Sequence, residues 1–498
     1  MQILDVSQIR SWDEYTIRKE PISSIDLMER AATACFDWLM INGFKEKNFT
    51  IFCGKGNNGG DGLAIARLLS SSGHQVSVRI LEFGAKGTDD FQTNLSRLHE
   101  TNVDIGFISS EESLHSIPSD HIIIDALLGS GLNKPLTGLS AVLTEHINQS
   151  GNKIISIDIP SGLYSDKSSK GAVTIKADYT LSFQCFKKAF LVSENAEAIG
   201  EVCILDIGLH PDYLHSIPAT ESLIDINYLK TFFRKRNRFA HKGQFGHAAI
   251  IAGSKGMMGA ALMAAQSCLA SGVGKLTCHI PAVGYDVLQI GAPEAMCKIE
   301  GNDHVEILSE LKGYNAIAVG PGLGKYPGQS SMLEQLFNQY QNPIVIDADG
   351  LNCLAENQSL LQKIPAGSVI TPHPKEFERL FGKTETDFDR IEIALEKANA
   401  LNIVIVLKGH HSLIAIPGSQ AYYNISGNAG MAKGGSGDIL TGIIVSLLAQ
   451  GYSGAEAACL GVWLHGRSAD IEVAGESYES LLPTQTLRSV GKAFRELY

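Results

Sequence analysis

The sequence predicts an α/β protein of two domains, each with a mainly parallel sheet covered by helices. In both halves of the chain, apolar runs of strand length alternate with amphipathic segments, a pattern typical of parallel sheets wrapped by helices. At 498 residues the chain is also long for one core, because a domain usually contains ~100–200 residues. We predict domains at 1–215 and 236–498, joined by a linker at 216–235.

In the first half, the leading segment 23–40 has the pattern of a helix, and six strands are expected after it. These strands lie within residues 50–53, 76–81, 121–128, 153–160, 179–183 and 201–208. The junction that follows contains two prolines, few strand signals and a basic cluster from Arg234 to Lys242. In the second half, strands are expected within residues 247–253, 274–280, 316–324, 343–350, 368–372, 403–409 and 412–418, followed by helices from Gly435 onward.

Composition favours small-molecule chemistry. The formal net charge of −12 argues against a nucleic-acid-binding surface, which needs clustered Lys and Arg, so we interpret the basic cluster as a solvated face. The nine cysteines form no C-x-x-C pair, which predicts neither a zinc site nor a disulfide framework. The N-terminus lacks a signal peptide, and no apolar stretch reaches the ~18 residues of a membrane span. We expect a soluble cytoplasmic protein that forms a homo-oligomer and has no membrane or nucleic-acid partner.

The first strand leads into the glycine-rich stretch "GKGNNGGDG". Gly54, Gly56 and Gly59 fit the G-x-G-x-x-G dinucleotide fingerprint, and Glu82 lies where the ribose-binding acid of a dehydrogenase should fall. However, the residues from Asn57 to Gly62 extend the turn beyond what that fingerprint requires. A plain dehydrogenase is therefore one hypothesis, and it leaves these residues unexplained.

Further polar groups follow the other strands of the first half, in "DALLGSGLNKPL", "DIPSGL" and "SFQCFKKAF". The carboxyl ends of parallel strands meet at one edge of a sheet, so these groups could share one crevice. Asn58, Asp125 and Ser161 offer only oxygen ligands, which suit an alkali or alkaline-earth cation better than zinc. Asp158 and Lys187 could act as acid and base, although Asp158 could equally be a turn former and Lys187 a surface charge.

The stretches "RSWDEYTI", "LMERAA", "GKGNNGGDGLAIARLL", "DALLGSGL" and "DIPSGL" resemble the NAD(P)H-hydrate epimerase family over the first ~210 residues. The resemblance implies a Rossmann-like three-layer sandwich, a K⁺ ion held by Asn58, Asp125 and Ser161, and substrate contact by Asp158. Lys187 matches the lysine of the family's F-x-x-x-K element, although Gln184 replaces a more frequent glycine. The dinucleotide-binding residues implied are Asn57, Asn58, Gly59, Gly60, Asp61, Gly129, Ser130, Gly131, Leu132, Asn133, Lys134 and Pro135.

The second half carries "GNAGMAKGGSGD", Gly427 to Asp438, directly before a helical segment. Glycines at a helix start leave N–H groups free to form an anion hole for a transferring phosphoryl group. Asp438 lies where it could take a proton from an attacking hydroxyl, although glycine-rich loops also begin ordinary helices. The stretches "GPGLG", "DADGLN", "TPHPKE" and "LKGHHSLIA" also follow strands, which favours a shared site.

This half resembles the ribokinase-like superfamily and, within it, the ADP-dependent NAD(P)H-hydrate dehydratases, from Arg238 to the C-terminus. The resemblance implies that Ala260, Gly322, His373 and Asp438 face the hydrated dinucleotide, although His373 could instead be a capping residue. The adenine-nucleotide site implied consists of Lys408, Gly409, His410, His411, Ser412 and Gly437.

The function implied is repair of hydrated NADH and NADPH. The first domain would interconvert the R and S hydrates, and the second would use ADP and Mg²⁺ to dehydrate the S hydrate to NAD(P)H, AMP and phosphate. The alternative is a vitamin or sugar kinase of the ribokinase-like superfamily fused to a dinucleotide-binding regulatory module.

Overall fold

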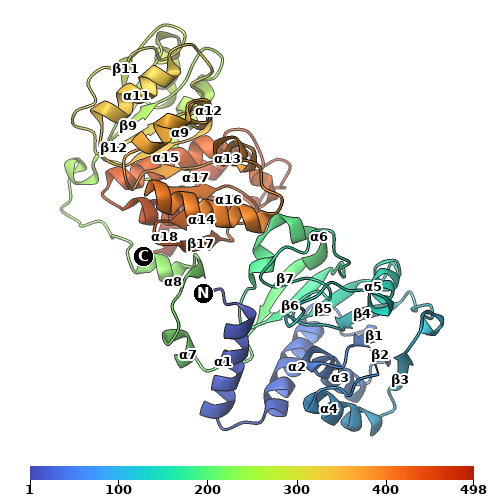
Figure 1. The fold of residues 1–498 in the computed structure, drawn as a ribbon. Coiled ribbons are helices and arrows are strands. Elements are labelled where there is room, and N and C mark those ends of the chain that lie inside the picture. Colours follow the sequence, from blue (N-terminus) through green and yellow to red (C-terminus); the bar gives the residue numbers. More distant parts are fainter. Residues whose placement is uncertain (83) are drawn as a thin grey trace. The chain divides into compact units, whose positions relative to one another are not determined.

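The computed structural model describes residues 1–82 and 84–498, which pack as two compact units. One unit spans Gln2–Ala219, and the other spans Thr220–Tyr498 together with Met1. Each unit contains one mainly parallel sheet with helices packed against it (Figure 1), which confirms the predicted α/β fold.

Every pair of neighbouring strands is parallel in the seven-stranded sheet of the first unit. Across the sheet, the strands are β3 (Asp104–Ile108), β2 (Val76–Leu81), β1 (Asn48–Cys53), β4 (His121–Ala126), β5 (Ile154–Ile157), β6 (Tyr179–Phe183) and β7 (Glu201–Leu205). The chain winds outward from β1 through β2 to β3 and then returns to β4 on the other side of β1. In such sheets, ligands bind beyond the carboxyl ends of the strands at this switch point.

The first unit has three layers. Alternate residues of β1 point to opposite faces, so Ile51 packs with α2 and α3, whereas Phe52 packs with α5 on the other face. Its helices are α1 (Val6–Lys19), α2 (Ser24–Ile41), α3 (Asn57–Ser71), α4 (Asp89–His99), α5 (Leu139–Asn148), α6 (Ala196–Ile199) and α7 (Asp212–His215), with short 3-10 turns η1 (Glu111–Ser113), η2 (Lys188–Leu191) and η3 (Ser193–Asn195).

In the second unit, the chain winds in the same way through a ten-stranded sheet, from β9 outward to β11 and then back to β12 on the other side of β9. Across the sheet, the strands are β11 (Met296–Ile299), β10 (Lys275–Ile280), β9 (His247–Ile251), β12 (Ala316–Val319), β13 (Ile344–Ile346), β14 (Val369–Ile370), β15 (Val404–Leu407), β16 (Ser412–Ile416), β17 (Gln420–Asn424) and β8 (Glu221–Leu223). Neighbours are parallel from β11 to β15, whereas β16 is antiparallel to both β15 and β17. The switch point therefore lies between β9 and β12.

A central pair of helices, α9 and α15, packs on this sheet, and α16 covers α15 and the strands β15 to β17. The helices of the unit are α8 (Ile226–Lys230), α9 (Met258–Ala270), α10 (Tyr285–Gly291), α11 (Gln329–Gln339), α12 (Ala348–Glu356), α13 (Pro374–Phe381), α14 (Asp387–Leu401), α15 (Ser436–Ala449), α16 (Gly454–Val473), α17 (Pro483–Arg488) and α18 (Val490–Glu496). Four 3-10 turns complete it: η4 (Lys242–Phe245), η5 (Ala282–Gly284), η6 (Gln358–Lys363) and η7 (Ala429–Met431).

The segment expected as a linker, 216–235, belongs in large part to the second unit. Strand β8 pairs with β17, and Leu223 and Leu229 are buried in the core of that unit. The Tyr228 ring stacks on Tyr422, with centroids 4.9 Å apart. The apolar residues of this segment therefore pack as an edge strand and a short helix, and the second unit begins at Thr220.

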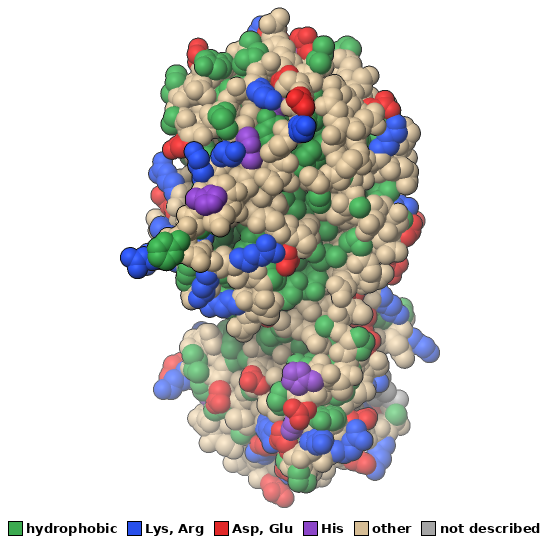
Figure 2. Space-filling model, turned by 90° about the vertical axis from the view of Figure 1, so that its left-hand side faces the viewer, with side chains coloured by type: hydrophobic (Ala, Val, Ile, Leu, Met, Phe, Trp, Pro, Cys, Tyr) green, Lys and Arg blue, Asp and Glu red, His purple; other side chains and the backbone are tan. Residues whose placement is uncertain are grey.

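The basic cluster after this segment is partly tied to its own unit. The Arg234 guanidinium lies over the Tyr452 ring at 4.7 Å, and that of Arg236 lies over the Phe245 ring at 3.8 Å. Figure 2 shows basic and acidic side chains interspersed on the face that it draws. These two arginines therefore have structural contacts of their own.

All nine cysteines lie in the described residues, where they are unpaired and buried or half-buried. None of the helices that the structure describes combines the length and the apolar character needed to cross a membrane.

The close packing of α15 on α9 depends on Gly442. A Cβ at this position would overlap the Ser267 hydroxyl and the Ala264 carbonyl oxygen. We expect Gly442→Ala to lower the free energy of unfolding of the second unit by about 1–3 kcal/mol, because overpacking forces the helices apart. Chemical denaturation of the full chain, followed by fluorescence of the buried Trp463, measures this change.

Gly491 in α18 gives the matched control, because a Cβ there meets nothing within 4 Å. Gly491→Ala should leave the unit as stable or stabilise it by up to about 1 kcal/mol through helix propensity. Equal destabilisation by both substitutions would contradict the packing argument.

Candidate active sites

A cavity of about 780 Å³ lies at the switch point of the first unit. Helices α1 and α2 and the loops after β1, β4 and β5 line it. Its polar groups include Arg10, Asp13, Asn58, Asp61, Ser130 and Asp158. The structure therefore brings together the strand ends that the sequence predicted to converge.

The glycine-rich stretch after β1 is shorter as a turn than the sequence suggested, because α3 already begins at Asn57. A Cβ at Gly54 would overlap the Leu127 carbonyl oxygen, and a Cβ at Gly59 would overlap the Gly54 carbonyl oxygen. These two glycines thus let the start of α3 lie directly on the strand ends. Gly60 packs against Met28 of α2. Gly59 and Gly60 therefore contribute to the site by allowing close backbone packing, not by side-chain contacts.

Asn57, Asn58 and Asp61, in the first two turns of α3, line the cavity. The Glu82 carboxylate instead pairs with the Lys55 ammonium and accepts a hydrogen bond from the Gly84 N–H at 2.7 Å. The dehydrogenase interpretation of Glu82 thus has a structural alternative, in which this residue fixes the neighbouring loop.

The second predicted loop, 129–135, enters the same cavity. Its residues Gly129 to Asn133 line the cavity, whereas Lys134 and Pro135 are exposed beside it. A Cβ at Gly129 would lie 3.0 Å from an Asp158 carboxylate oxygen and 3.2 Å from the Asn58 Cβ. Glycine here lets the loop pass between the two side chains.

Asp158 and Lys187 form a buried ion pair. The Lys187 Nζ lies 2.8 Å from Asp158 Oδ1 and donates to the Ser182 hydroxyl at 2.5 Å, while the Ser130 N–H donates to Asp158 Oδ2 at 2.9 Å. Burial alone would raise the pKa of Asp158, but the Lys187 ammonium and these hydrogen bonds outweigh it and lower the pKa. Lys187 is only 1% exposed, so it is a partner of Asp158 rather than a surface charge. Asp158 also has a φ of 68°, a backbone conformation that stores strain in a residue other than glycine.

The three predicted cation ligands differ in their surroundings. The Ser161 N–H and hydroxyl donate to the Asp125 carboxylate at 2.9 and 2.6 Å, and Ser156 donates to it at 2.7 Å. In contrast, both polar atoms of the Asn58 side chain are buried and have no hydrogen-bond partner among the described residues. Such an unsatisfied buried amide needs a ligand, an ion or water.

Asp13 of α1 is a cavity residue that the sequence did not predict. Its carboxyl lines the same cavity as Asp158. Burial and the negative charge of Asp158 raise the pKa of Asp13 to about 7, and burial, Asp158 and Asp13 raise the pKa of Asp61 as well. The stretch "RSWDEYTI" contained Asp13, but a carboxylate on an amphipathic helix carries no local signal that it faces a cavity.

In the second unit, the residues predicted to form the site follow the parallel strands β9 and β12 to β15 or lie at the start of α15. Lys408, after β15, donates to Asp347 Oδ1 at 2.8 Å, and Thr441 of α15 donates to Asp347 Oδ2 at 2.8 Å. A Cβ at Gly437 would lie 3.3 Å from both Lys408 Nζ and an Asp347 oxygen. The start of α15 therefore rests directly on this ion pair.

Asp347 lies in "DADGLN", and the sequence alone predicted no role for this residue. Burial opposes its ionisation, yet the Lys408 ammonium and hydrogen bonds lower the pKa of Asp347. Asp438, in the first turn of α15, behaves in the opposite way. Burial and the charge of Asp347 raise the pKa of Asp438 to about 7, although the ammonium of Lys408 partly offsets them. Asp438 is thus a carboxyl poised to exchange a proton near neutral pH.

Ala260 and Gly322 lie side by side, as the prediction of a shared site requires. Gly322 has a φ of 59°, and a Cβ there would lie 3.0 Å from the Ala260 Cβ. His373 caps α13, since its Nδ1 accepts from the Lys375 and Glu376 N–H groups. Burial and the Lys408 charge lower the pKa of His373, which keeps the ring neutral. The capping role is therefore present, and the exposed face of the ring remains open to a substrate.

Five of the six predicted nucleotide residues, 408–412, run from the end of β15 into the start of β16, whereas Gly437 lies in the first turn of α15. The rings of His410 and His411 lie 4.3 Å apart, and burial followed by the proximity of His410 lowers the pKa of His411 to about 4. Gly409 and Ser412 complete the turn between Lys408 and the antiparallel strand β16.

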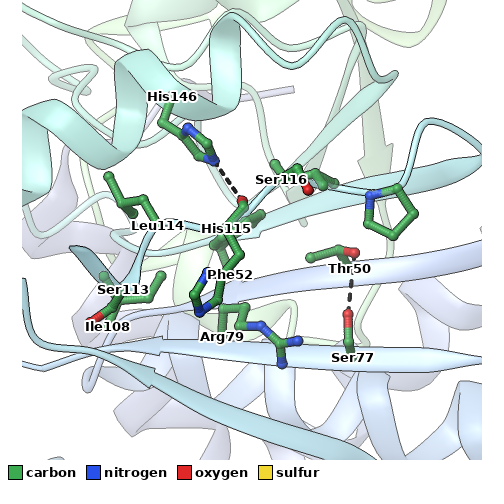
Figure 3. A pocket seen from close by; sticks show the side chains of 12 residues that line it. Thr50, Phe52, Ser77, Arg79, Ile108, Ser113, Leu114, His115, Ser116 and His146 are labelled. Carbon is green, nitrogen blue, oxygen red and sulfur yellow. Dashed lines mark hydrogen bonds between the residues drawn. The ribbon is translucent and has the colours of Figure 1, made fainter. Parts of the chain in front are cut away.

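A smaller cavity, of about 50 Å³, lies under α5 on the other face of the first sheet (Figure 3). Two of its polar side chains are paired: Thr50 with Ser77 at 3.2 Å, and His146 with the His115 carbonyl at 3.0 Å. The sequence predicted no site residue in it.

Two family profiles match the chain: "NAD(P)H-hydrate dehydratase" over residues 248–491 and "YjeF-related protein N-terminus" over residues 24–189. A bifunctional NAD(P)H-hydrate repair enzyme of Thermofilum pendens is 33% identical, with 100% of this chain and 97% of that protein covered. A repair enzyme of the same name from Coxiella burnetii is 34% identical, with 96% of each chain covered.

The second unit is similar to a solved structure, an ADP/ATP-dependent NAD(P)H-hydrate dehydratase of Bacillus subtilis co-crystallised with ATP and Mg²⁺. The identity is 30% and the TM-score is 0.50, over 56% of this chain and 99% of that one. The similarity confirms the predicted ribokinase-like fold of this unit.

Lys408 should stabilise the second unit because it neutralises the buried Asp347 carboxylate. Asp347 has a side chain only 2% exposed, so we expect Lys408→Met to cost about 3–5 kcal/mol of unfolding free energy. Adding Asp347→Asn to Lys408→Met should recover much of this loss, because no charge is then left unpaired. Chemical denaturation of both variants measures the difference, and equal stabilities would contradict this account.

Proposed function

The chain belongs to the family of bifunctional NAD(P)H-hydrate repair enzymes, and we propose that the residues of the two sites described above carry out its two reactions. The first unit is the NAD(P)H-hydrate epimerase and the second is the ADP-dependent dehydratase. The observation that supports the assignment best is Asp438, a carboxyl with a pKa of about 7 at the start of α15, beside the Lys408–Asp347 pair.

The chemistry of dehydration follows from this geometry. Hydroxide is a poor leaving group, so the ring hydroxyl of the hydrate must first be converted into a better one. Asp438 removes the hydroxyl proton, and the oxygen attacks the terminal phosphoryl group of ADP, which releases AMP. The ring nitrogen then supplies the electron pair that expels phosphate and leaves a C=N bond. Loss of a proton from the adjacent ring carbon returns those electrons to nitrogen and restores NAD(P)H.

The chain's own groups stabilise the charge that develops in this step. N–H groups at the start of α15 and the Lys408 ammonium lie next to Asp438, where a phosphoryl group would be transferred. The turn from Lys408 to Ser412 and Gly437 would hold the nucleotide, while Ala260, Gly322 and His373 would face the dinucleotide.

Mg²⁺ would enter with the nucleotide. This ion is usually held by one or two carboxylates together with substrate phosphates and water. The carboxylates of Asp347, Asp349 and Glu376 lie around Lys408 and Asp438 and fit this requirement. When bound, Mg²⁺ neutralises phosphate charge during phosphoryl transfer.

In the first unit, the dinucleotide would lie in the 780 Å³ cavity, against the start of α3 and loop 129–135. Asp158 would act as an acid–base group while the configuration of the hydroxyl-bearing ring carbon changes. Lys187 would hold the Asp158 carboxylate ionised and fixed in position.

We propose a K⁺ ion at Asn58, Asp125 and Ser161. The unpartnered side-chain oxygen of Asn58 and the oxygen-rich pair Asp125–Ser161 fit a hard monovalent cation. Within the described residues, no group of three or more His, Cys, Asp or Glu side chains is placed to hold a metal ion.

The alternative, a vitamin or sugar kinase fused to a dinucleotide-binding regulatory module, would leave the hydroxyl phosphorylated. The same Asp438 could serve a kinase, so substrate decides between the two. Formation of AMP and recovery of reduced-nicotinamide absorbance from ADP and hydrated NADH support dehydration, whereas stable phosphorylation of a pyrimidine or sugar alcohol by ATP would support the kinase.

Asp438→Asn should abolish repair of both epimers, with a loss of about 10²–10⁴-fold expected for a missing general base. In the wild-type chain, dehydration of the S hydrate should rise with pH through about 7, because Asp438 must be ionised to accept the proton. Initial rates of NADH recovery between pH 5.5 and 9 measure both effects. Asp158→Asn is the reciprocal control: it should leave the S hydrate unaffected and slow only the R hydrate, and slow repair of both would contradict the division of labour.

K⁺ should raise the melting temperature of the first unit, because a ligand that binds only the folded state stabilises it. KCl is compared with choline chloride at equal ionic strength, by calorimetry and by the epimerisation rate. Asn58→Leu should remove the difference, whereas Asn42→Ala, at an exposed position on α2's C-terminal end, should keep it. An unchanged K⁺ effect in Asn58→Leu would overturn the site.

A further inference from the structure

Asp13 is a further carboxyl in the cavity of the first unit, beside Asp158 and Asp61, and it reaches the cavity from a different element than either of them. Asp13 lies on α1, whereas Asp158 follows β5 at the edge of the sheet. Asp158 is held by Lys187 and Ser130, but the Asp13 carboxylate has no hydrogen bond or ion pair within the described part of the chain. Asp13 is half-buried in the wall of the cavity, and a carboxyl with a perturbed pKa and no protein partner in a binding cavity indicates a functional role.

Epimerisation of a hydrated nicotinamide needs two proton-exchanging groups. The carbon that bears the hydroxyl is bonded to the ring nitrogen, so its configuration can change when water leaves from one face and adds to the other. The departing oxygen needs an acid on its face, and the entering water needs a base on the opposite face. A single carboxylate fixed by a lysine, such as Asp158, can serve only one face at a time.

We propose that Asp13 is the second catalytic carboxyl of the epimerase, acting on the ring face that Asp158 does not reach; the proposal rests on the assignment of this cavity as the epimerase site. In one direction, the Asp13 carboxyl donates its proton to the hydroxyl and the C–O bond breaks. The nitrogen lone pair forms a C=N bond, and water leaves.

In the second half of the reaction, water attacks the same carbon from the other face while Asp158 accepts its proton. The C=N electrons return to nitrogen, so the product is the other epimer. Asp158 then passes a proton to solvent and Asp13 takes one up, which restores the starting state. The reverse direction exchanges the two roles, and no oxidant, reductant or further reactant is needed.

The charges around the two carboxyls support this division. Burial and Asp158 raise the pKa of Asp13 to about 7, whereas the Lys187 ammonium keeps that of Asp158 low. One proton is thus held mainly on Asp13 near neutral pH, and environments that separate two carboxyl pKa values indicate an acid and a base. The other ionisable groups that line the cavity or neighbour these two carboxyls are Arg10, Glu14, Asp61, Lys187 and Asp90.

The test uses the full chain, pure R hydrate and H₂¹⁸O. The epimers are separated, and their ¹⁸O content is measured by mass spectrometry. Wild-type epimerisation should introduce one solvent oxygen per turnover and should slow above pH 7, as the proton leaves Asp13. Asp13→Asn should slow epimerisation by about 10²-fold or more, with little change in KM, and should remove the alkaline decline. Asp13→Glu should restore part of the rate and the decline.

Two controls separate this proposal from misfolding and from failure of the assigned function. Dehydration of the S hydrate by the same Asp13→Asn preparation should equal that of the wild type, and Asp37→Asn, at an exposed carboxylate of α2, should epimerise normally. If the wild-type chain does not interconvert the epimers, the assignment of the cavity fails. If it does, then retention of the original oxygen or a normal rate in Asp13→Asn overturns the role of Asp13.

Discussion

Each unit is organised around one lysine–aspartate pair at the carboxyl edge of its parallel sheet, in which one partner is buried and the other half-buried. In both pairs, Lys187–Asp158 and Lys408–Asp347, the ammonium lies 2.8 Å from the carboxylate. Neither partner could be buried alone without a cost of several kcal/mol, so each pair must form as its sheet and the following loops assemble. Since the lysine and the aspartate come from different strand ends, the ion pair also fixes the relative position of two loops that line the site.

The pair has a chemical consequence for its neighbour. Each aspartate stays ionised because of its lysine, and its negative charge then acts on a second carboxyl that has no cation of its own. That second carboxyl is Asp13 in the first unit and Asp438 in the second, and burial together with the paired aspartate raises the pKa of each to about 7. Two unrelated sites thus reach the same result, a fixed anion beside a carboxyl that can exchange protons at neutral pH.

Much of this arrangement could be predicted from the sequence, because it depends on strand ends. Asp158 and Lys408 directly follow apolar runs of strand length, and polar groups at such positions must meet at one edge of a parallel sheet. The contribution of α1 could not be predicted in the same way, because the direction in which Asp13 points depends on how α1 packs on the rest of the unit. The strand in the segment after Ala219 could not be predicted for a related reason: the apolar residues of β8 gain their strand partner only from β17, about 200 residues later.

Gln184 shows how a departure from the family pattern can be compatible with the site. It has a φ of 61°, in the region where glycine is favoured, so glutamine is strained at this position. Its side-chain oxygen, however, accepts hydrogen bonds from the Ile207 N–H at 3.0 Å and the Leu209 N–H at 3.4 Å. Ile207 and Leu209 line the cavity, and Lys187 follows Gln184 by three residues. The glutamine therefore offsets its backbone strain by tying the turn that carries Lys187 to the cavity-lining segment 207–209, a contact that glycine could not make.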